Sequence, residues 1–139
     1  MTSRTWLLHL GEEECADLLA RTSLGRLGVV VDGRPEIFPV NHVYDAATAT
    51  VAFPTNERTK VHGALNWPFV AFEVDGLEPE DDSGWSVLVV GHAEEITDTG
   101  EIERLSEQRK VLWHPLETVR WLRIVPTKVT GRRIQAVPG

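Results

Sequence analysis

Apolar residues recur with a period of two, or run nearly unbroken, over much of the chain, which is typical of β-strands. Residues 26–31, 36–44 and 50–54 have this pattern and predict three strands. Asp32-Gly33 lies between the first two, and it is a strong hairpin signal because both central positions of such a turn need positive φ. The pattern predicts a three-stranded antiparallel meander in this part of the chain.

Further strands are predicted in the second half. Residues 69–75, "FVAFEVD", are followed by an acidic segment rich in glycine and proline, which is typical of an exposed loop. The segment 85–96, "WSVLVVGHAEEI", is nearly continuously apolar through Val90, which favours burial on both faces, as in a barrel wall or a dimer contact. Residues 118–134 alternate until Pro126 interrupts them, so they predict a bent strand or a pair of strands.

Three segments have helical features. Residues 10–25 begin with acidic residues suited to a helix N-terminus and end at a glycine. Residues 57–66 can form a short helix, and Thr97 or Asp98 can cap another over 99–113. Six or seven strands with two or three short helices predict a closed antiparallel barrel.

Composition narrows the class of protein. The chain has 139 residues, of which 42% are hydrophobic, so one domain with a proper core is expected over 1–139. Its net charge of -7 repels polyanions, so nucleic-acid binding is not expected. The N-terminus lacks the features of a signal peptide, and no apolar run approaches the roughly 20 residues that cross a bilayer. We therefore expect a cytoplasmic protein without membrane contacts.

Most of the reactive residue types show no catalytic or metal-binding arrangement. The five histidines are scattered, and no G-x-S-x-G motif is present. Cys15 lies on a leucine-lined helix face, where an inert buried thiol is expected. Asp81 and Asp82 are typical of a solvated loop rather than a cation site. Neither a catalytic side chain nor a metal site is predicted.

The segment 53–61, "FPTNERTKV", is the exception. Thr55 and Thr59 offer hydroxyls, Arg58 a planar fork of donors and Lys60 a mobile charge. A helix that starts near Asn56 would add free backbone N–H groups, and the set could hold a phosphate. The two cations could equally occupy the exposed side of a short helix, since no glycine-rich phosphate loop is present. The residues alone leave both interpretations open.

Taken with residues 84–98, this segment resembles the pyridoxamine 5'-phosphate oxidase-like family of FMN-binding split barrels. In that family a strand ending in an aromatic residue and a threonine precedes a basic segment that binds the flavin phosphate, and a later strand ends in G-x-A-E. The matching residues are Phe53, Thr55, Lys60, Ser86, Val87, Gly91, Ala93 and Glu94. Residues 123–133, "RIVPTKVTGRR", are similar to the closing strand of the family.

The resemblance implies a mainly β (α+β) fold, namely a six- to seven-stranded antiparallel split β-barrel of Greek-key type with two or three short helices. It also implies a homodimer with FMN at the subunit interface. Arg58, Thr59 and Lys60 would hold the phosphate. The implied cofactor-binding residues are Pro39, Val40, Asn41, Phe53, Thr55, Arg58, Thr59, Lys60, Trp85 and Ser86.

The activity that the resemblance implies is transfer of electrons from a reduced nicotinamide, through FMN, to a small acceptor. No catalytic side chain is required, because the cofactor carries the chemistry. Oxidation of vitamin B6 is not expected, since the chain ends shortly after Arg133, without the extension that binds the pyridoxal substrate in true oxidases. One alternative is a deazaflavin in place of FMN. The other is a non-catalytic binding or sensor protein that holds a flavin, a haem or no cofactor, with His42 or His92 as the haem ligand.

Overall fold

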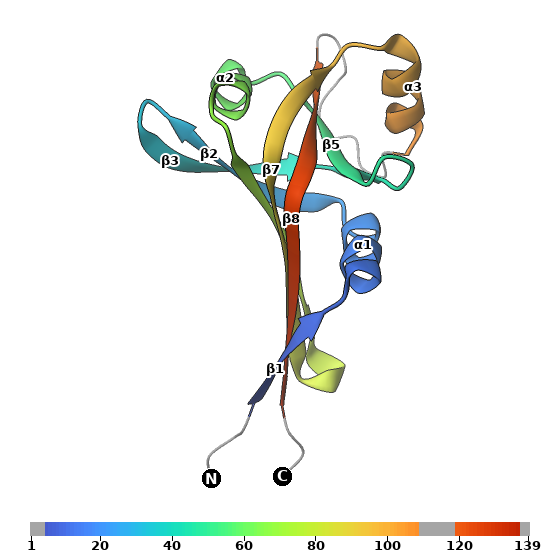
Figure 1. Ribbon diagram of the computed structural model, residues 1–139. Coiled ribbons are helices and arrows are strands. Elements are labelled where there is room, and N and C mark those ends of the chain that lie inside the picture. Colours follow the sequence, from blue (N-terminus) through green and yellow to red (C-terminus); the bar gives the residue numbers. More distant parts are fainter. Residues whose placement is uncertain (1–4, 109–118, 137–139) are drawn as a thin grey trace.

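The computed structural model describes residues 5–108 and 119–136, which form an eight-stranded antiparallel sheet with three α-helices (Figure 1). The elements are β1 (Thr5–Leu10), α1 (Glu12–Arg21), β2 (Leu24–Val31), β3 (Arg34–Asn41), β4 (Val43–Asp45), β5 (Thr50–Thr55), α2 (Arg58–Asn66), β6 (Val70–Glu78), the 3₁₀ turn η1 (Pro79–Asp81), β7 (Ser83–Ile96), α3 (Thr99–Glu107) and β8 (Arg120–Ala136). The mainly β class is confirmed, and β1 and β4 bring the number of strands above the six or seven expected.

The strand order is β3-β2-β6-β7-β8-β5-β4, and β1 pairs with β8 outside this path. Each of the two strands at the ends of the path pairs with a single neighbour, β3 with β2 and β4 with β5. Hydrogen bonding therefore does not close the sheet, and the expectation of a closed barrel is wrong.

The β2–β3 hairpin is confirmed. Asp32 and Gly33 occupy its turn with φ of 52° and 76°. The predicted meander is confirmed only in part. Val43 and Tyr44 pair with Ala52 and Val51 across the predicted turn, but they belong to the separate strand β4, and β5 pairs with β8 and not with β3. The chain turns away after β3, where the N–H of His42 donates to the carbonyl of Ser23 at 3.0 Å.

Residues 76–84 are mostly strand rather than the predicted loop. Gly76 pairs with Trp85, and the turn itself is short, with Asp82 at a φ of 48°. A Cβ at position 76 would come within 2.7 Å of the Trp85 ring, so the glycine lets this aromatic side chain lie across the hairpin. Residues 120–136 form one strand, and its register shifts where Gly91 faces Pro126, in agreement with the predicted bend.

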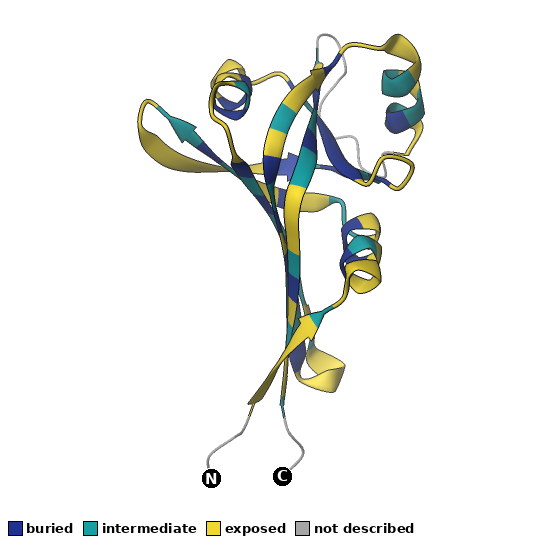
Figure 2. Ribbon diagram, in the orientation of Figure 1, coloured by how far each residue is buried: buried dark blue, intermediate teal, exposed yellow. Residues whose placement is uncertain are grey.

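The main hydrophobic core lies between the sheet and helices α1 and α2, and a second, smaller cluster lies beneath α3 around Leu105 and Trp121 (Figure 2). Cys15 is buried in the main core, as expected, and burial raises the pKa of its thiol. Along β7 burial alternates: Val87 and Val89 are buried whereas Leu88 is 41% exposed. Burial on both faces of this strand is therefore not found within one chain.

The cap of α3 is Asp98, whose side chain accepts the N–H of Glu101 at 2.9 Å. The described part of this helix ends at Glu107, and residues 109–113 of the predicted helix lie outside the described residues. Among the described helices, none has the length and apolar character needed to cross a bilayer. Helices α2 and α3 flank one end of the sheet, whereas β1 and η1 lie at the other end (Figure 1).

Candidate functional site

The start of α2 carries backbone donors that the fold leaves free. The first helical hydrogen bond runs from the N–H of Val61 to the carbonyl of Glu57 at 3.1 Å, and the Glu57 side chain does not cap the helix. Within the described residues, no hydrogen bond satisfies the N–H groups of Arg58, Thr59 and Lys60. Such donors, at the positive end of the helix dipole, favour an anion.

Thr55 fixes the approach to the helix. It ends β5, is 5% exposed, and its hydroxyl accepts the N–H of Glu57 at 3.1 Å. Phe53, two residues earlier, is fully buried in the main core. The phenyl ring therefore anchors the strand from which α2 begins, and it contributes to the site through that position.

Lys60 is a largely buried cation, with a side chain that is 9% exposed. Its Nζ lies 5.4 Å from the centroid of the Phe38 ring and 3.9 Å from the nearest carboxylate oxygen, Oε2 of Glu57. Burial lowers the pKa of the Lys60 ammonium, and the nearby Glu57 carboxylate partly opposes this shift. Because 3.9 Å is too long for a hydrogen bond, the ammonium retains its capacity to bind an anion.

Arg58 and Thr59 are exposed beside Lys60. In the described part of the chain, the Arg58 guanidinium makes neither an ion pair nor a hydrogen bond. Thr55, Arg58, Thr59 and Lys60 thus form one cluster of donors at the start of α2, which is called the α2 cluster below.

β3 runs next to the α2 cluster, because its Phe38 is the aromatic partner of Lys60. Val40 is buried in the core, whereas Pro39 and Asn41 project to the opposite face of the strand. Oδ1 of Asn41 is buried and lacks a hydrogen-bond partner among the described residues. An unpaired buried acceptor is costly, so this position fits a ligand that donates a hydrogen bond.

Trp85 and Ser86 lie far from the α2 cluster within one chain. Ser86 lies near the start of β7 (Ser83–Ile96), which follows η1, whereas α2 flanks the other end of the sheet (Figure 1). Ser86 pairs with Asp75 and Arg132, and Trp85 covers Gly76. The structure brings Phe38 of β3 to the α2 cluster, places Pro39 and Asn41 on the other face of that strand, and leaves Trp85 and Ser86 at the other end of β7.

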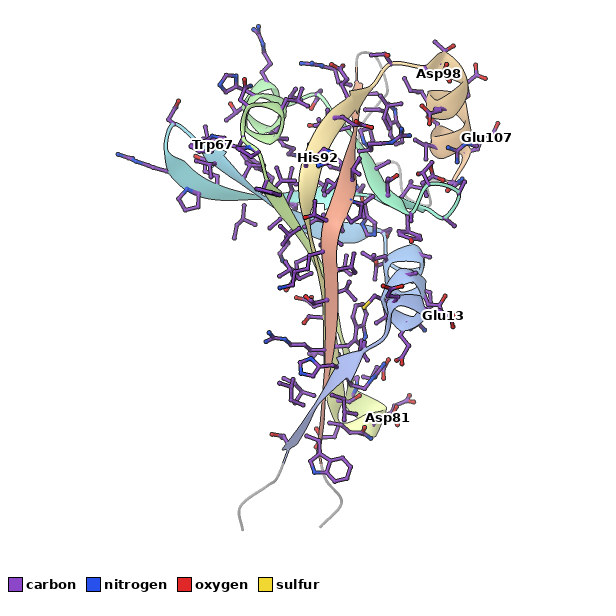
Figure 3. The ribbon with its side chains drawn as sticks, in the orientation of Figure 1. Glu13, Trp67, Asp81, His92, Asp98 and Glu107 are labelled. Atoms are coloured by element: carbon purple, nitrogen blue, oxygen red, sulfur yellow. The ribbon has the colours of Figure 1, made fainter. Side chains whose placement is uncertain are left out.

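The histidines considered as haem ligands are placed differently. His42 is 4% exposed, and its Nε2 lies 3.0 Å from the Leu19 carbonyl and 3.2 Å from the Thr22 hydroxyl. His92 is exposed on β7 (Figure 3). Among the described residues there is no cluster of three or more histidine, cysteine or acidic side chains that could hold a metal ion.

A groove along α2 contains residues that the sequence did not single out. It has a volume of about 330 Å³ and is lined by Arg58, Val61, His62, Leu65, Asn66 and Arg120. Arg58, His62 and Asn66 are four residues apart, a spacing that places them on one face of a helix and that is visible in the sequence. Arg120 comes from β8, and only the pairing of β8 with β5 brings it to the groove.

Comparison with known proteins identifies the family. Residues 11–133 match the family model described as pyridoxamine 5'-phosphate oxidase. The chain belongs to this family. An uncharacterised protein of Mycobacterium tuberculosis is 34% identical over 140 residues, which cover 94% of this chain and 87% of that protein.

Solved structures support the same conclusion. An FAD-binding protein from Mycobacterium smegmatis has a TM-score of 0.78 and 36% identity, covering 92% of this chain and 98% of that one. An FAD-binding protein from Mesorhizobium loti has a TM-score of 0.79 and 25% identity, covering 95% and 99%. Together with the sheet order these matches confirm the predicted antiparallel split β-barrel fold.

Proposed function

We propose that this chain binds a flavin through its phosphate at the α2 cluster and acts as an oxidoreductase. The observation that carries this proposal is the environment of Lys60, a buried ammonium 3.9 Å from its nearest carboxylate oxygen. A buried charge of this kind is stable only with a partner, and a phosphate is a partner of the right sign. Two similar structures are of FAD-binding proteins, which supports a flavin as the ligand.

Each member of the α2 cluster has a distinct part in holding the phosphate. Lys60 supplies a positive charge, and Arg58 adds a planar fork of donors from the exposed side. The free N–H groups at the helix start donate directly, and the Thr59 hydroxyl is a further donor. Thr55 keeps the preceding turn in place through the N–H of Glu57.

β3 is the element that fits the flavin ring. The buried Oδ1 of Asn41 accepts no hydrogen bond from a described residue, and the imide N–H of a flavin is a suitable donor. Pro39 lies on the same face of the strand and offers an apolar surface, while the buried Val40 holds the strand to the core.

A second protomer completes this proposal. Because Trp85 and Ser86 lie at the other end of β7 from the α2 cluster, a partner chain would have to supply them to the same site. Several large apolar side chains are exposed on the monomer, among them Ile37 at 72%, Leu77 at 83% and Trp6 at 59%. Exposed apolar surface of this extent supports a homodimer, because burying it would be favourable.

The proposed cofactor supplies the chemistry: a bound flavin can accept a hydride from a reduced nicotinamide and pass two electrons to a small acceptor. The protein's part is to position the flavin and to balance negative charge near its phosphate and ring. FMN is the form that the family resemblance favours. A deazaflavin is the second candidate, since the groove with Arg58 and Arg120 is basic and could receive a longer acidic tail.

The test is to titrate the purified protein with FMN and to follow flavin fluorescence and absorption. We expect saturable binding, and bleaching of the flavin band when NADH or NADPH is added without oxygen. If no flavin, neither FMN nor FAD, and no deazaflavin binds at high micromolar concentration, the proposal is overturned. Binding without bleaching by either nicotinamide would overturn the oxidoreductase part and leave a flavin-binding protein.

A further inference from the structure

The groove beside the α2 cluster has a chemistry of its own. Arg58 is both the first residue of α2 and part of the groove wall, so the groove begins where the proposed phosphate site ends. Its volume of about 330 Å³ lies in the usual range for small-ligand pockets. The groove can therefore receive a group that is attached to the first phosphate.

The walls of the groove are positively charged. Arg120 donates from Nε and Nη2 to the Glu95 carboxylate at 2.9 and 2.6 Å, which leaves its Nη1 available. Arg58 has no acidic partner in the described part of the chain. With one carboxylate against two guanidinium groups, the local charge is positive on a chain whose net charge is -7. A second phosphate is the group that this wall favours.

The floor of the groove is apolar. Val61 is 3% exposed and Leu65 is half-buried, and both lie between the polar residues of the helix. Asn66 closes the groove, and its Nδ2 donates to the His62 carbonyl at 2.7 Å. Its Oδ1 accepts no hydrogen bond from the residues that the structure describes, so it can accept one from an exocyclic amino group. A flat base suits this floor better than a tail of carboxylates, which gains nothing from apolar contact.

We infer that the groove is an adenylate site, formed by Arg58, Arg120, Asn66 and the Val61–Leu65 floor, and that it takes the adenosine monophosphate half of FAD. This inference rests on the proposed function, because the flavin half would occupy the α2 cluster. The second phosphate meets the two guanidinium groups, and the adenine lies over the floor with its amino group towards Asn66. The same adenylate chemistry is present in a reduced nicotinamide dinucleotide.

The experiment compares FAD with FMN by fluorescence titration of the wild-type protein and of two variants. R120Q/E95Q removes the guanidinium together with its carboxylate partner. An unpaired Glu95 would otherwise repel the phosphate and lower the affinity for a separate reason. N66A removes the proposed acceptor for the base. We expect wild-type protein to bind FAD at least about tenfold more tightly than FMN. Each variant should lower FAD affinity about tenfold and leave FMN affinity, the internal control, unchanged.

The outcomes separate the adenylate site from the flavin site. The adenylate site is overturned if wild-type protein binds FAD and FMN with equal affinity and neither variant changes the affinity for FAD or NADH. The proposed function would still stand. Failure to bind any flavin would overturn the proposed function. If the variants weaken only the binding of NADH to FMN-loaded protein, the adenylate site is supported. The adenylate group that it binds is then the one in NADH and not the one in FAD. If instead the variants weaken only deazaflavin binding, the groove is a tail site and the inference is overturned.

Discussion

Two charged regions of this molecule, the α2 cluster and the contact between α3 and the β4–β5 turn, differ in what the fold does with their charges. Asp45, at the end of β4, is 1% exposed and accepts two hydrogen bonds from Arg104 of α3, at 2.9 and 3.0 Å. It also accepts one from the Thr48 hydroxyl at 2.8 Å. Lys60 is nearly as buried, yet its closest carboxylate oxygen is 3.9 Å away.

The difference shows which charges are available for a ligand. The hydrogen bonds from Arg104 lower the pKa of the Asp45 carboxyl, so folding keeps it ionised and paired. Burial of the Lys60 ammonium lowers its pKa, so folding disfavours its charge. A paired charge such as that of Asp45 stabilises the fold. A buried charge without a close partner, such as that of Lys60, lowers the stability of the fold until an anion binds to it.

Removing the cations of the α2 cluster tests this difference most strongly. R58A/K60A should weaken FMN binding by a few kcal/mol, at about 1.5–3 kcal/mol for each charge-assisted contact. Fluorescence titration measures the change. R21A/K128A, which removes the same charge from exposed positions on α1 and β8, is the matched control and should leave the affinity within about threefold of wild type. Unchanged binding by R58A/K60A would show that the phosphate lies elsewhere.

Breaking the paired region should affect stability instead. D45N removes the carboxylate that Arg104, Thr48 and the N–H of Ala47 share, and we expect a loss of about 2–3 kcal/mol in the free energy of unfolding. Urea denaturation measures it, and D17N, at an exposed position on α1, is the control. A D45N protein as stable as wild type would remove the contrast with the α2 cluster.

His42 adds a pH-dependent case. Burial lowers the pKa of its imidazole, and the contact with the Leu19 carbonyl partly opposes this. The unfolded chain therefore binds a proton below about pH 6.5 that the folded chain does not, and stability falls with decreasing pH there. One proton gives a slope of at most about 1.4 kcal/mol per pH unit. Urea denaturation between pH 7.5 and 5.5 should show it, and H42Q should show a smaller slope; equal slopes would contradict the assignment.

Replacing Lys60 by an uncharged side chain should have the smallest effect on stability. K60M keeps a long apolar stem beside Phe38 but removes the buried charge. Because no close acceptor loses its partner, we expect the free energy of unfolding without ligand to stay within about 1 kcal/mol and to increase rather than decrease. Urea denaturation of ligand-free protein measures this. A loss as large as that of D45N would mean that Lys60 belongs to the fold rather than to a ligand site.

The features predicted from the sequence are those encoded in neighbouring residues. Asp32-Gly33 forms the predicted turn, and Arg58–Asn66 forms the predicted helix after Thr55. The errors concern pairings between distant segments, since nothing local indicates that β5 pairs with β8 or that Thr5–Leu10 forms a strand along β8. Such pairings depend on which edges remain free once the rest of the sheet has formed.

The same limit applies to the candidate site. The donors of the α2 cluster lie close together in the sequence, so an anion site was one of the two interpretations that their residue types allowed. Arg120 reaches the groove from a strand that begins more than fifty residues after α2 ends, and Asp45 meets Arg104 across 59 residues. Spacing in the sequence could not indicate whether Arg58 and Lys60 have acidic partners, which is the property that separates a ligand site from a solvated helix face.

The central proposal, that the α2 cluster holds a flavin phosphate, is tested most directly by comparing FMN with riboflavin, which has the same ring and no phosphate. Affinities of wild-type protein and R58A/K60A for both compounds form a thermodynamic cycle that isolates the phosphate contribution. We predict that wild-type protein prefers FMN to riboflavin by about a hundredfold or more, and that R58A/K60A loses most of this preference. The same preference in both proteins would contradict phosphate binding at the start of α2.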